Sequence, residues 1–289
     1  METGTFKRIS AFSLAVLVTL TLAACMLSPG KFISNLDLRK DGQFAFSYRG
    51  EIYLLALTKL AEMGRKPGDA TFEPEPCFNR KGAERTCTPS EIVAQKEGWE
   101  AEQQASAEKS KKDAEEMKPF LGGIDPSDPK AAEELAARLR KQAGWQSVVY
   151  KGDGLFEVDF AISGKLDHDF TFPTIERFPM ANAFVQLALH SDGTVRIDAP
   201  AFGAGASGNP FMQLAQMSAM ERAMDNKSEK KDMPKIPQLD GQFTLTTNGQ
   251  ILANNTDEGP KADPAGQRLG WTVNVRTNSA PTALIKLVN

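Results

Sequence analysis

Short runs of alternating apolar and polar residues recur along most of the chain, and they predict β-strands that bury one face. In the first clear example, Phe44, Phe46 and Tyr48 alternate with polar or small neighbours. Successive side chains of a strand point to opposite faces, so these aromatic side chains are expected on one buried face. The same alternation recurs in residues 155–162, 183–189, 194–197, 243–247 and 271–275. The pattern indicates a sheet with one covered face and one face in water.

Four dipeptides between these runs have the composition of tight turns: Asp41-Gly42, Asp153-Gly154, Asp192-Gly193 and Asn248-Gly249. Such pairs tolerate the positive φ angles that two-residue hairpin turns require. Four hairpins are therefore expected, and hairpins in series build an antiparallel sheet.

Two apolar segments outside the strands have helical character. Residues 52–62 are rich in Leu and Ala and stop before Gly64, so a helix there is expected to pack on the sheet. Asp128-Pro129 predicts the start of another helix, which continues through Gln142 and ends at Gly144. Helices combined with an antiparallel sheet place the chain in the α+β class.

A longer and much more polar helix is predicted between these two. Thr88-Pro89-Ser90-Glu91 has the form of a capping box with proline at the first helical position. The helix is expected to run to about Lys118, and it consists mostly of Glu, Lys, Gln and Ala. A solvated helix is one interpretation, and a segment that binds a partner protein is the other. Residues 64–144 as a whole are expected to form a charged helical insertion.

The first 25 residues have the layout of an export signal. Lys7 and Arg8 precede an uncharged apolar run over residues 9–22, which is shorter than the roughly 20 residues of a membrane-spanning helix. The small pair Ala23-Ala24 then stands directly before Cys25, and Leu22-Ala23-Ala24-Cys25 resembles the lipobox of bacterial lipoproteins. In that family the signal is removed and the cysteine is fatty-acylated, for example by palmitate. An ordinary cleaved signal and an uncleaved anchor are the alternatives.

Acylation of Cys25 would place the protein in a bacterial cell envelope. Acyl chains contribute about 0.8 kcal/mol per buried methylene, so several chains hold a domain on a bilayer. In Gram-negative lipoproteins an aspartate after the cysteine is linked to retention in the inner membrane, and here that residue is Met26. The resemblance thus implies outer-membrane delivery, facing the periplasm, if the cell is Gram-negative.

The two other cysteines, Cys77 and Cys87, fit the same compartment. In an oxidising periplasm such a pair is expected to form a disulfide. A metal site is disfavoured, because the spacing is too wide for a two-cysteine knuckle and the only histidines, His168 and His190, are distant in the sequence. Neither histidine belongs to a catalytic signature, so both are expected at surface or structural positions.

Composition is that of a globular domain, with 41% hydrophobic residues, 25% charged residues and a formal net charge of −3. No basic stripe interleaved with aromatic residues is present, which disfavours nucleic acid as a partner. The patterns together divide the chain into a signal peptide (1–24), a first hairpin and helix (25–63), the helical insertion (64–144) and the rest of the main α+β domain (145–289).

A glycine motif raises the question of a nucleotide cofactor. Gly203-x-Gly205-x-x-Gly208 matches the dinucleotide-binding fingerprint, but the preceding strand is half exposed and is broken by Pro200. A nucleotide-binding parallel sheet requires a near-continuous apolar strand at this position. Ser207 does not lie in a nucleophile elbow either. A loop is therefore expected, with no cofactor and no catalytic residues, and the protein is predicted not to be an enzyme.

The segment after these glycines is apolar almost all round a predicted helix. Its large apolar residues are Phe211, Met212, Leu214, Met217, Met220 and Met224. Methionine is over-used at adaptable apolar binding surfaces. One interpretation is a helix packed on the sheet, and the other is a wall that contacts lipid or another hydrophobic ligand.

Two stretches resemble a known family. The segment from Cys25 to Phe32, which leads into the Asp41-Gly42 turn, and the late Asn248-Gly249-x-Ile251 and Gly270-Trp271-Thr272-Val273 motifs are similar to the ends of the LppM-type envelope lipoprotein domain. The resemblance implies an α+β fold, a small sheet with a packed helix, and a role in handling envelope lipids. It transfers no catalytic residue, and the insertion around residues 77–142 departs from its pattern.

Two functions follow as hypotheses. The first is a membrane-tethered, non-catalytic binding module for a lipid or other hydrophobic envelope molecule. The second is a structural or assembly lipoprotein whose charged helices bind an envelope protein.

Overall fold

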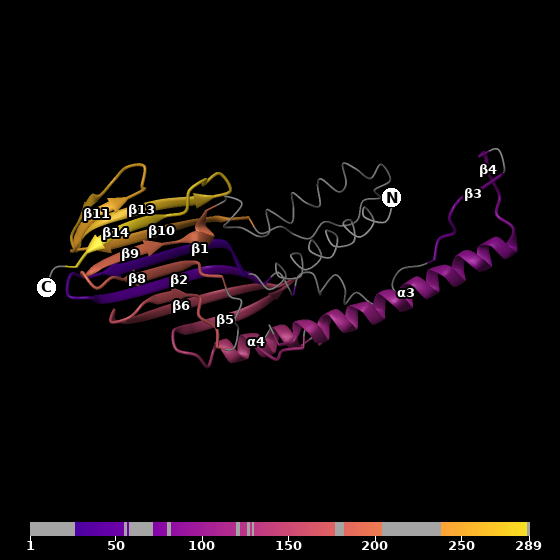
Figure 1. Cartoon of the computed structure of the whole chain (residues 1–289), viewed down its shortest axis with the longest axis horizontal. Coiled ribbons are helices and arrows are strands. Elements are labelled where there is room, and N and C mark those ends of the chain that lie inside the picture. Colours follow the sequence, from indigo (N-terminus) through magenta and orange to yellow (C-terminus); the bar gives the residue numbers. More distant parts are fainter. Residues whose placement is uncertain are drawn as a thin grey trace, which may run out of the picture.

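The computed structural model describes residues 27–54, 57, 72–79, 82–119, 122–125, 128, 130–176, 182–203 and 238–287. Within them the chain is mostly β-sheet with two helices (Figure 1). Two sheets form the main body, and a two-stranded ribbon lies apart from them. The α+β class is compatible with this content, although β-structure dominates.

A seven-stranded sheet forms the larger layer, in the order β12-β13-β10-β1-β2-β6-β5. Its strands are β1 (Leu27–Leu38), β2 (Gln43–Leu54), β5 (Trp145–Gly152), β6 (Leu155–Lys165), β10 (Asp240–Thr247), β12 (Lys261–Asp263) and β13 (Gly266–Asn274). The expectation of a purely antiparallel sheet is wrong at one place, because β1 and β10 pair in parallel. Some two hundred residues separate these two strands, so no hairpin turn forces them to pair antiparallel. The chain returns to the middle of the sheet to form β10.

A second sheet of five strands runs in the order β11-β14-β9-β8-β7. Its strands are β7 (Phe170–Phe172), β8 (Val185–Leu189), β9 (Thr194–Asp198), β11 (Gln250–Asn254) and β14 (Thr282–Lys286). The hairpin expected at Asn248-Gly249 is wrong, since β10 before it belongs to the larger sheet and β11 after it pairs with β14. The turn therefore carries the chain from one layer to the other.

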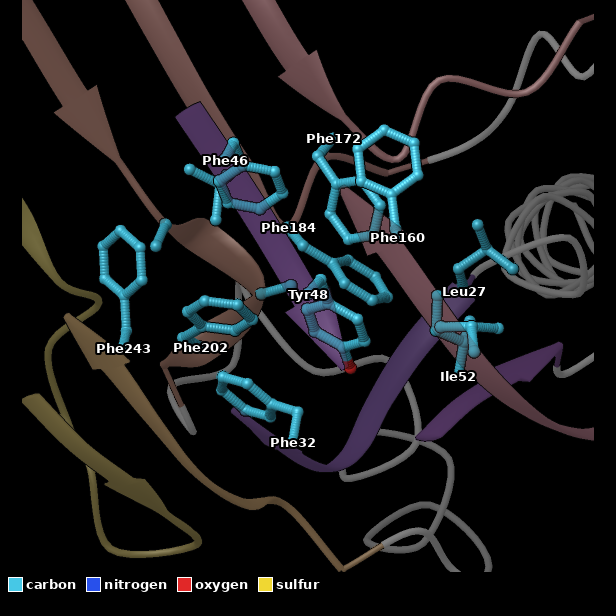
Figure 2. Packing of buried hydrophobic residues seen from close by; sticks show 14 of the residues in the cluster. Leu27, Phe32, Phe46, Tyr48, Ile52, Phe160, Phe172, Phe184, Phe202 and Phe243 are labelled. Carbon is cyan, nitrogen blue, oxygen red and sulfur yellow. The ribbon is translucent and has the colours of Figure 1, made fainter. Parts of the chain in front are cut away.

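Aromatic side chains fill the space between the two sheets (Figure 2). Phe46 of β2 lies 5.1 Å, between ring centroids, from Phe172 of β7, and both side chains are fully buried. Phe32 of β1 stacks at 4.2 Å on Phe202, which belongs to the short 3-10 helix η3 (Pro200–Phe202). Each large aromatic side chain buries roughly 150–250 Å², so this layer is the main source of stability. The alternating sequence pattern exists because each strand sends every second side chain into it.

The helix predicted over residues 52–62 is wrong at its start. Strand β2 continues to Leu54, and Ile52 and Tyr53 pair with Phe156 and Leu155 of β6. Ile52 is buried in the aromatic layer, so strand pairing and burial outweigh the local helical composition. Leu57 is helical and buried, and the rest of residues 55–63 lies outside the described residues.

Two helices and the ribbon lie between β2 and β5 in the sequence. Helix α3 (Pro89–Met117) has 29 residues and leads away from the sheets, with the ribbon of β3 (Cys77–Phe78) and β4 (Glu84–Arg85) at its far end (Figure 1). Helix α4 (Ala131–Leu139) is shorter at both ends than the predicted 128–142. It buries Leu135 and Leu139 in the core beside β5.

Candidate functional site

The structure describes only some of the predicted site residues. Cys25 lies outside the described residues, and so does the whole apolar segment from Phe211 to Met224. The expected disulfide between Cys77 and Cys87 is present. Its position locates the first of three regions with functional character, the disulfide tip, defined as residues 72–79 and 82–95.

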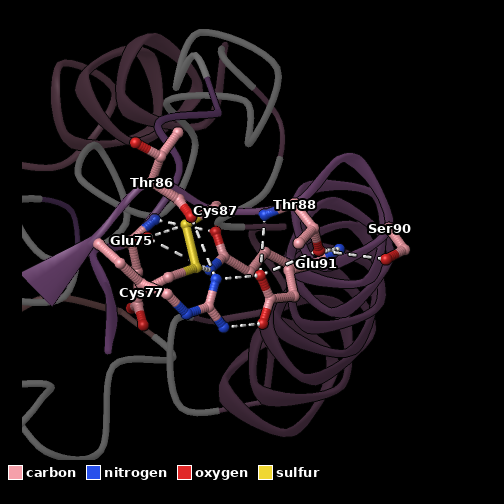
Figure 3. A network of polar contacts seen from close by, with 9 residues as sticks. Glu75, Cys77, Thr86, Cys87, Thr88, Ser90 and Glu91 are labelled. Carbon is pink, nitrogen blue, oxygen red and sulfur yellow. Dashed lines mark hydrogen bonds and ion pairs between the residues drawn. A yellow bond between two sulfur atoms is a disulfide. The ribbon is translucent and has the colours of Figure 1, made fainter. Parts of the chain in front are cut away.

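The disulfide tip is held together by polar and covalent contacts (Figure 3). Cys77 lies in β3 and Cys87 lies directly before the helix cap, so the disulfide joins the ribbon to the start of α3. The backbone N–H of Glu75 donates to Oε1 of Gln95 at 2.9 Å, and Nε2 of Gln95 donates to the carbonyl of Glu75 at 3.2 Å. The ribbon is thus fixed against the first turns of the helix.

The capping box predicted at the start of α3 is confirmed. The backbone N–H of Glu91 donates to the Thr88 hydroxyl, and the backbone N–H of Thr88 donates to the Glu91 carboxylate. Arg85 of β4 donates to both carboxylate oxygens of Glu91, at 2.8 and 2.5 Å. The Arg85 guanidinium, followed by the Thr88 hydrogen bonds, lowers the pKa of Glu91 to about 2. The ionised Glu91 carboxylate therefore links the ribbon to the helix, and these contacts favour its ionised form.

The disulfide tip also exposes apolar side chains. Phe78 is 58% exposed, Val93 is 55% exposed and Ile92 is 36% exposed. Large exposed apolar groups on a rigid support are typical of protein contact surfaces. The sequence signal for this region was the cysteine pair, but the exposure of Phe78 was not predicted.

The beginning of β1 is the second region. The backbone N–H of Leu27 donates to Oδ1 of Asn182 at 2.9 Å, and the Leu27 side chain is buried opposite Leu54 of β2. The first described residue is therefore already fixed in the core. Only Met26 separates it from Cys25.

A β-bulge begins three residues later, where Gly30 and Lys31 together oppose Glu51 of β2. The Glu51 carboxylate accepts a hydrogen bond from the backbone N–H of Lys31 at 2.9 Å. Gly50 beside it has a φ of +150°, and a Cβ there would lie 2.2 Å from the Lys31 carbonyl oxygen. Only glycine fits at this close approach of two strands.

The bulge borders the third region, a surface depression of about 430 Å³ on the face of the seven-stranded sheet that points away from the core. This outer-face depression is lined by Lys31, Phe32, Ile33, Arg49, Asp240, Gly241, Gln242 and Thr272. Its walls come from four adjacent strands, β2, β1, β10 and β13. The depression was not predicted from the sequence, because it depends on the pairing of β1 with β10.

Tyr48 and the two histidines lie at buried structural or surface positions. Tyr48 is fully buried and its hydroxyl donates to the Glu51 carbonyl at 2.8 Å, and burial, followed by the nearby Glu51 carboxylate, raises its pKa. His168 is exposed and contacts Asp167. His190 follows β8, and its backbone closes the turn to β9. Among the described residues, no three His, Cys, Asp or Glu side chains converge to hold a metal ion.

Only one of the three fingerprint glycines lies among the described residues. Gly203 follows η3 with an extended backbone, while Gly205 and Gly208 lie outside the described residues. No helix in the described part of the chain is long and apolar enough to cross a membrane.

Comparison with known proteins gives little further guidance. No protein-family model matches the chain, and no curated protein gives a significant match. Among solved structures, the NMR structure of the folded domain of LppM from Mycobacterium tuberculosis aligns over 91% of this chain and 92% of that chain. The identity is 10% and the TM-score is 0.30, which is too low to establish a shared fold.

Proposed function

We propose that the protein is a lipoprotein of a bacterial cell envelope, anchored through acyl chains on Cys25. The Leu22-Ala23-Ala24-Cys25 sequence supports this, and the position of β1 adds a structural reason. Because Leu27 is already held in the sheet, the lipidated residue would lie within roughly 10 Å of it, at about 3.5 Å per extended residue. The sheet end at Leu27 is thus the end held at the membrane, and this short tether is the observation that carries the proposal.

Metabolic labelling tests the anchor. Cells that express the full-length chain are grown with radioactive palmitate, and the protein is then partitioned between detergent and water. The wild type should carry label and enter the detergent phase, whereas Cys25→Ser should lose both properties. Cys77→Ser is the matched control and should keep the label. Equal labelling of the wild type and Cys25→Ser would reject the proposal.

We further propose that the anchored domain is non-catalytic and binds a lipid or another hydrophobic envelope molecule. The apolar set Phe211, Met212, Leu214, Met217, Met220 and Met224 supplies the candidate surface. Described residues on either side of residues 204–237, the stretch that carries this set, lie at Phe32. Phe202, before the segment, stacks on Phe32, and Gly241, after it, pairs with Phe32 across β1 and β10. The stretch that carries the candidate surface therefore leaves and rejoins the described chain beside the middle of β1.

Native mass spectrometry tests this binding. The full-length protein is purified in mild detergent from its own envelope, and co-purifying lipids are identified. A variant with Met212, Met217 and Met220 changed to Ser should lose most of the bound lipid. Met63→Ser is the control for loss of a methionine elsewhere. A wild type that carries no more lipid than the triple variant would reject ligand binding and leave the anchor untouched.

A second function is favoured by the exposed apolar side chains of the disulfide tip. At about 1.5 Å per residue, α3 is roughly 43 Å long, so Phe78 and Val93 are presented far from the sheets. This arrangement suits an assembly lipoprotein that contacts an envelope protein.

Site-specific photocrosslinking distinguishes this second function. A photoreactive amino acid at Phe78 or Val93 should give a specific adduct in intact cells, and the same probe at Ser163 of β6 should not. Absence of any adduct from both tip positions would remove this function.

Placement in the outer membrane is part of the same proposal for a Gram-negative cell, because the residue after Cys25 is Met26 rather than aspartate. Fractionation of membranes by density tests it. A Met26→Asp variant should then move to the inner membrane.

A further inference from the structure

The outer-face depression owes its shape to strand geometry. Strand register places Lys31 beside Asp240, and Ile33 beside both Arg49 and Gln242. On the core face, Gly241 leaves room for the Phe32 ring, since a Cβ there would come within 2.5 Å of it. Because neighbouring strands are about 4.8 Å apart, the outward side chains of Lys31, Ile33, Arg49, Asp240 and Gln242 project around one small area on the other face.

The polar groups around this area are not satisfied by one another. Among the described residues, the side chains of Lys31, Asp240 and Gln242 form no hydrogen bond or ion pair. Arg49 donates through Nε and Nη2 to the Asp159 carboxylate at 2.9 and 2.6 Å, which leaves Nη1 for another acceptor. The depression therefore offers a primary ammonium, a guanidinium nitrogen, a carboxylate and an amide.

An apolar side chain lies in the middle of these groups. Ile33 is 58% exposed although it belongs to a central strand, and its register neighbours Arg49 and Gln242 are polar. On the same face of β1, the next outward residues are Asn35 and Asp37. Ile33 thus departs from the polar pattern at the place where the sheet is hollowed.

We propose that the outer-face depression binds a compact zwitterion, in which an acidic group lies close to a primary ammonium. Lys31 and Arg49 would receive the acidic oxygens, Asp240 would receive the ammonium, and Ile33 would contact the carbon atoms between them. The Asp240 carboxylate disfavours binding of a simple anion, because like charges repel at close range. For the same reason, Lys31 and Arg49 disfavour binding of a simple amine. A ligand with both charges satisfies all three residues.

Two ligand sources share this chemistry, free amino acids or peptides and phosphoethanolamine headgroups. Binding is measured on the full-length chain in non-ionic detergent by saturation-transfer NMR. The probes are alanine, the dipeptide Ala-Ala, O-phosphoethanolamine, inorganic phosphate, acetate and ethanolamine, each up to about 10 mM, since an open surface site is expected to bind weakly. Either class of zwitterion should bind at least about tenfold more tightly than phosphate, acetate or ethanolamine, and the preferred zwitterion identifies the source.

Variants connect the binding to the depression. Lys31→Gln and Asp240→Asn should each weaken binding of the preferred zwitterion about tenfold or more, and Asp240→Asn should reduce the preference over the matching anion. Arg268→Gln on the same face of β13 is the control and should bind as the wild type does. All variants must retain the wild-type circular dichroism spectrum. Absence of zwitterion binding, equal binding of phosphate, or an equal loss in Arg268→Gln would overturn the proposal.

Discussion

The two sheets and the disulfide tip both carry aromatic residues but are held together in opposite ways. In the sheets, Phe46, Phe172 and Phe184 are completely buried between the layers. In the tip, Phe78 is more exposed than buried, and the order of the chain depends on a disulfide, a capping box and an ion pair. Of the two aromatic residues of the tip, Phe72 lies 6.0 Å, between ring centroids, from Trp99 of α3, whereas the exposed Phe78 side chain is available for contact with another molecule.

The same contrast separates two kinds of stability. A buried apolar layer depends on burial and is insensitive to pH and redox conditions. A small unit without a core depends on a few specific bonds, such as a disulfide or an ion pair, and reduction or a change of pH can break these one at a time. Four changes, from the largest expected effect to the smallest, test this contrast.

The first change removes an aromatic ring from the layer between the sheets. Phe172→Ala should lower the free energy of unfolding by about 3–5 kcal/mol, because a cavity remains where Phe172 now contacts Phe46 of β2 and Phe184 directly before β8. Denaturant unfolding followed by tryptophan fluorescence, to which Trp145 with its ring 6.0 Å from Phe172 contributes, measures the effect. Phe78→Ala should change it by less than about 0.5 kcal/mol. Equal losses for the two variants would contradict the contrast.

The second change removes the disulfide. The double variant Cys77→Ser with Cys87→Ser should destabilise the tip by roughly 2–3 kcal/mol, since the closed loop is short. Hydrogen exchange should become faster in β3, β4 and the first turn of α3, while exchange in β1 and β2 stays unchanged. Faster exchange in the sheets as well would show that tip and sheets unfold together.

Sequence reasoning succeeded where local signals decide the structure. The capping box at Thr88 and Glu91 needs only neighbours in the chain, and the Cys77–Cys87 pair was the one pairing left after Cys25 was assigned to lipid. Alternation located the strands because one face of each packs against the aromatic layer.

Sequence reasoning failed where contacts between residues far apart in the chain determine the structure. The pairing of β1 with β10, on which the outer-face depression depends, and the pairings of β14 with β9 and β11, which build the second sheet, have no local signature and were not predicted. Ile52 was assigned to a helix because its partner on β6, Phe156, lies about a hundred residues away. The exposed Ile33 on an otherwise polar strand face was the available signal for the depression, but it becomes visible only when the facing strands are known.

The third change removes the cap of α3. Thr88→Ala should destabilise the start of the helix by about 1 kcal/mol, because the hydroxyl that accepts the Glu91 N–H is lost. Thr88→Ser keeps the hydroxyl and should retain most of the protection. Amide exchange at Glu91 and Ile92 measures the difference. If Thr88→Ala and Thr88→Ser behave alike, the side-chain cap does not hold the tip.

The fourth change is acidification, which separates the tip from the sheets without a substitution. The pKa of Glu91 is about 2 in the folded tip, against an ordinary value of 4.5, so below pH 4.5 the unfolded chain binds more protons at this site than the folded one. The contribution of Glu91 is therefore complete above pH 4.5 and is lost as the pH falls toward 2. Amide exchange at the start of α3 should accelerate over this range relative to α4, after correction for intrinsic rates. Glu91→Gln should remove the acceleration. An unchanged response in that variant would mean that another carboxyl controls the tip, and the ionised Arg85–Glu91 pair would no longer account for its order.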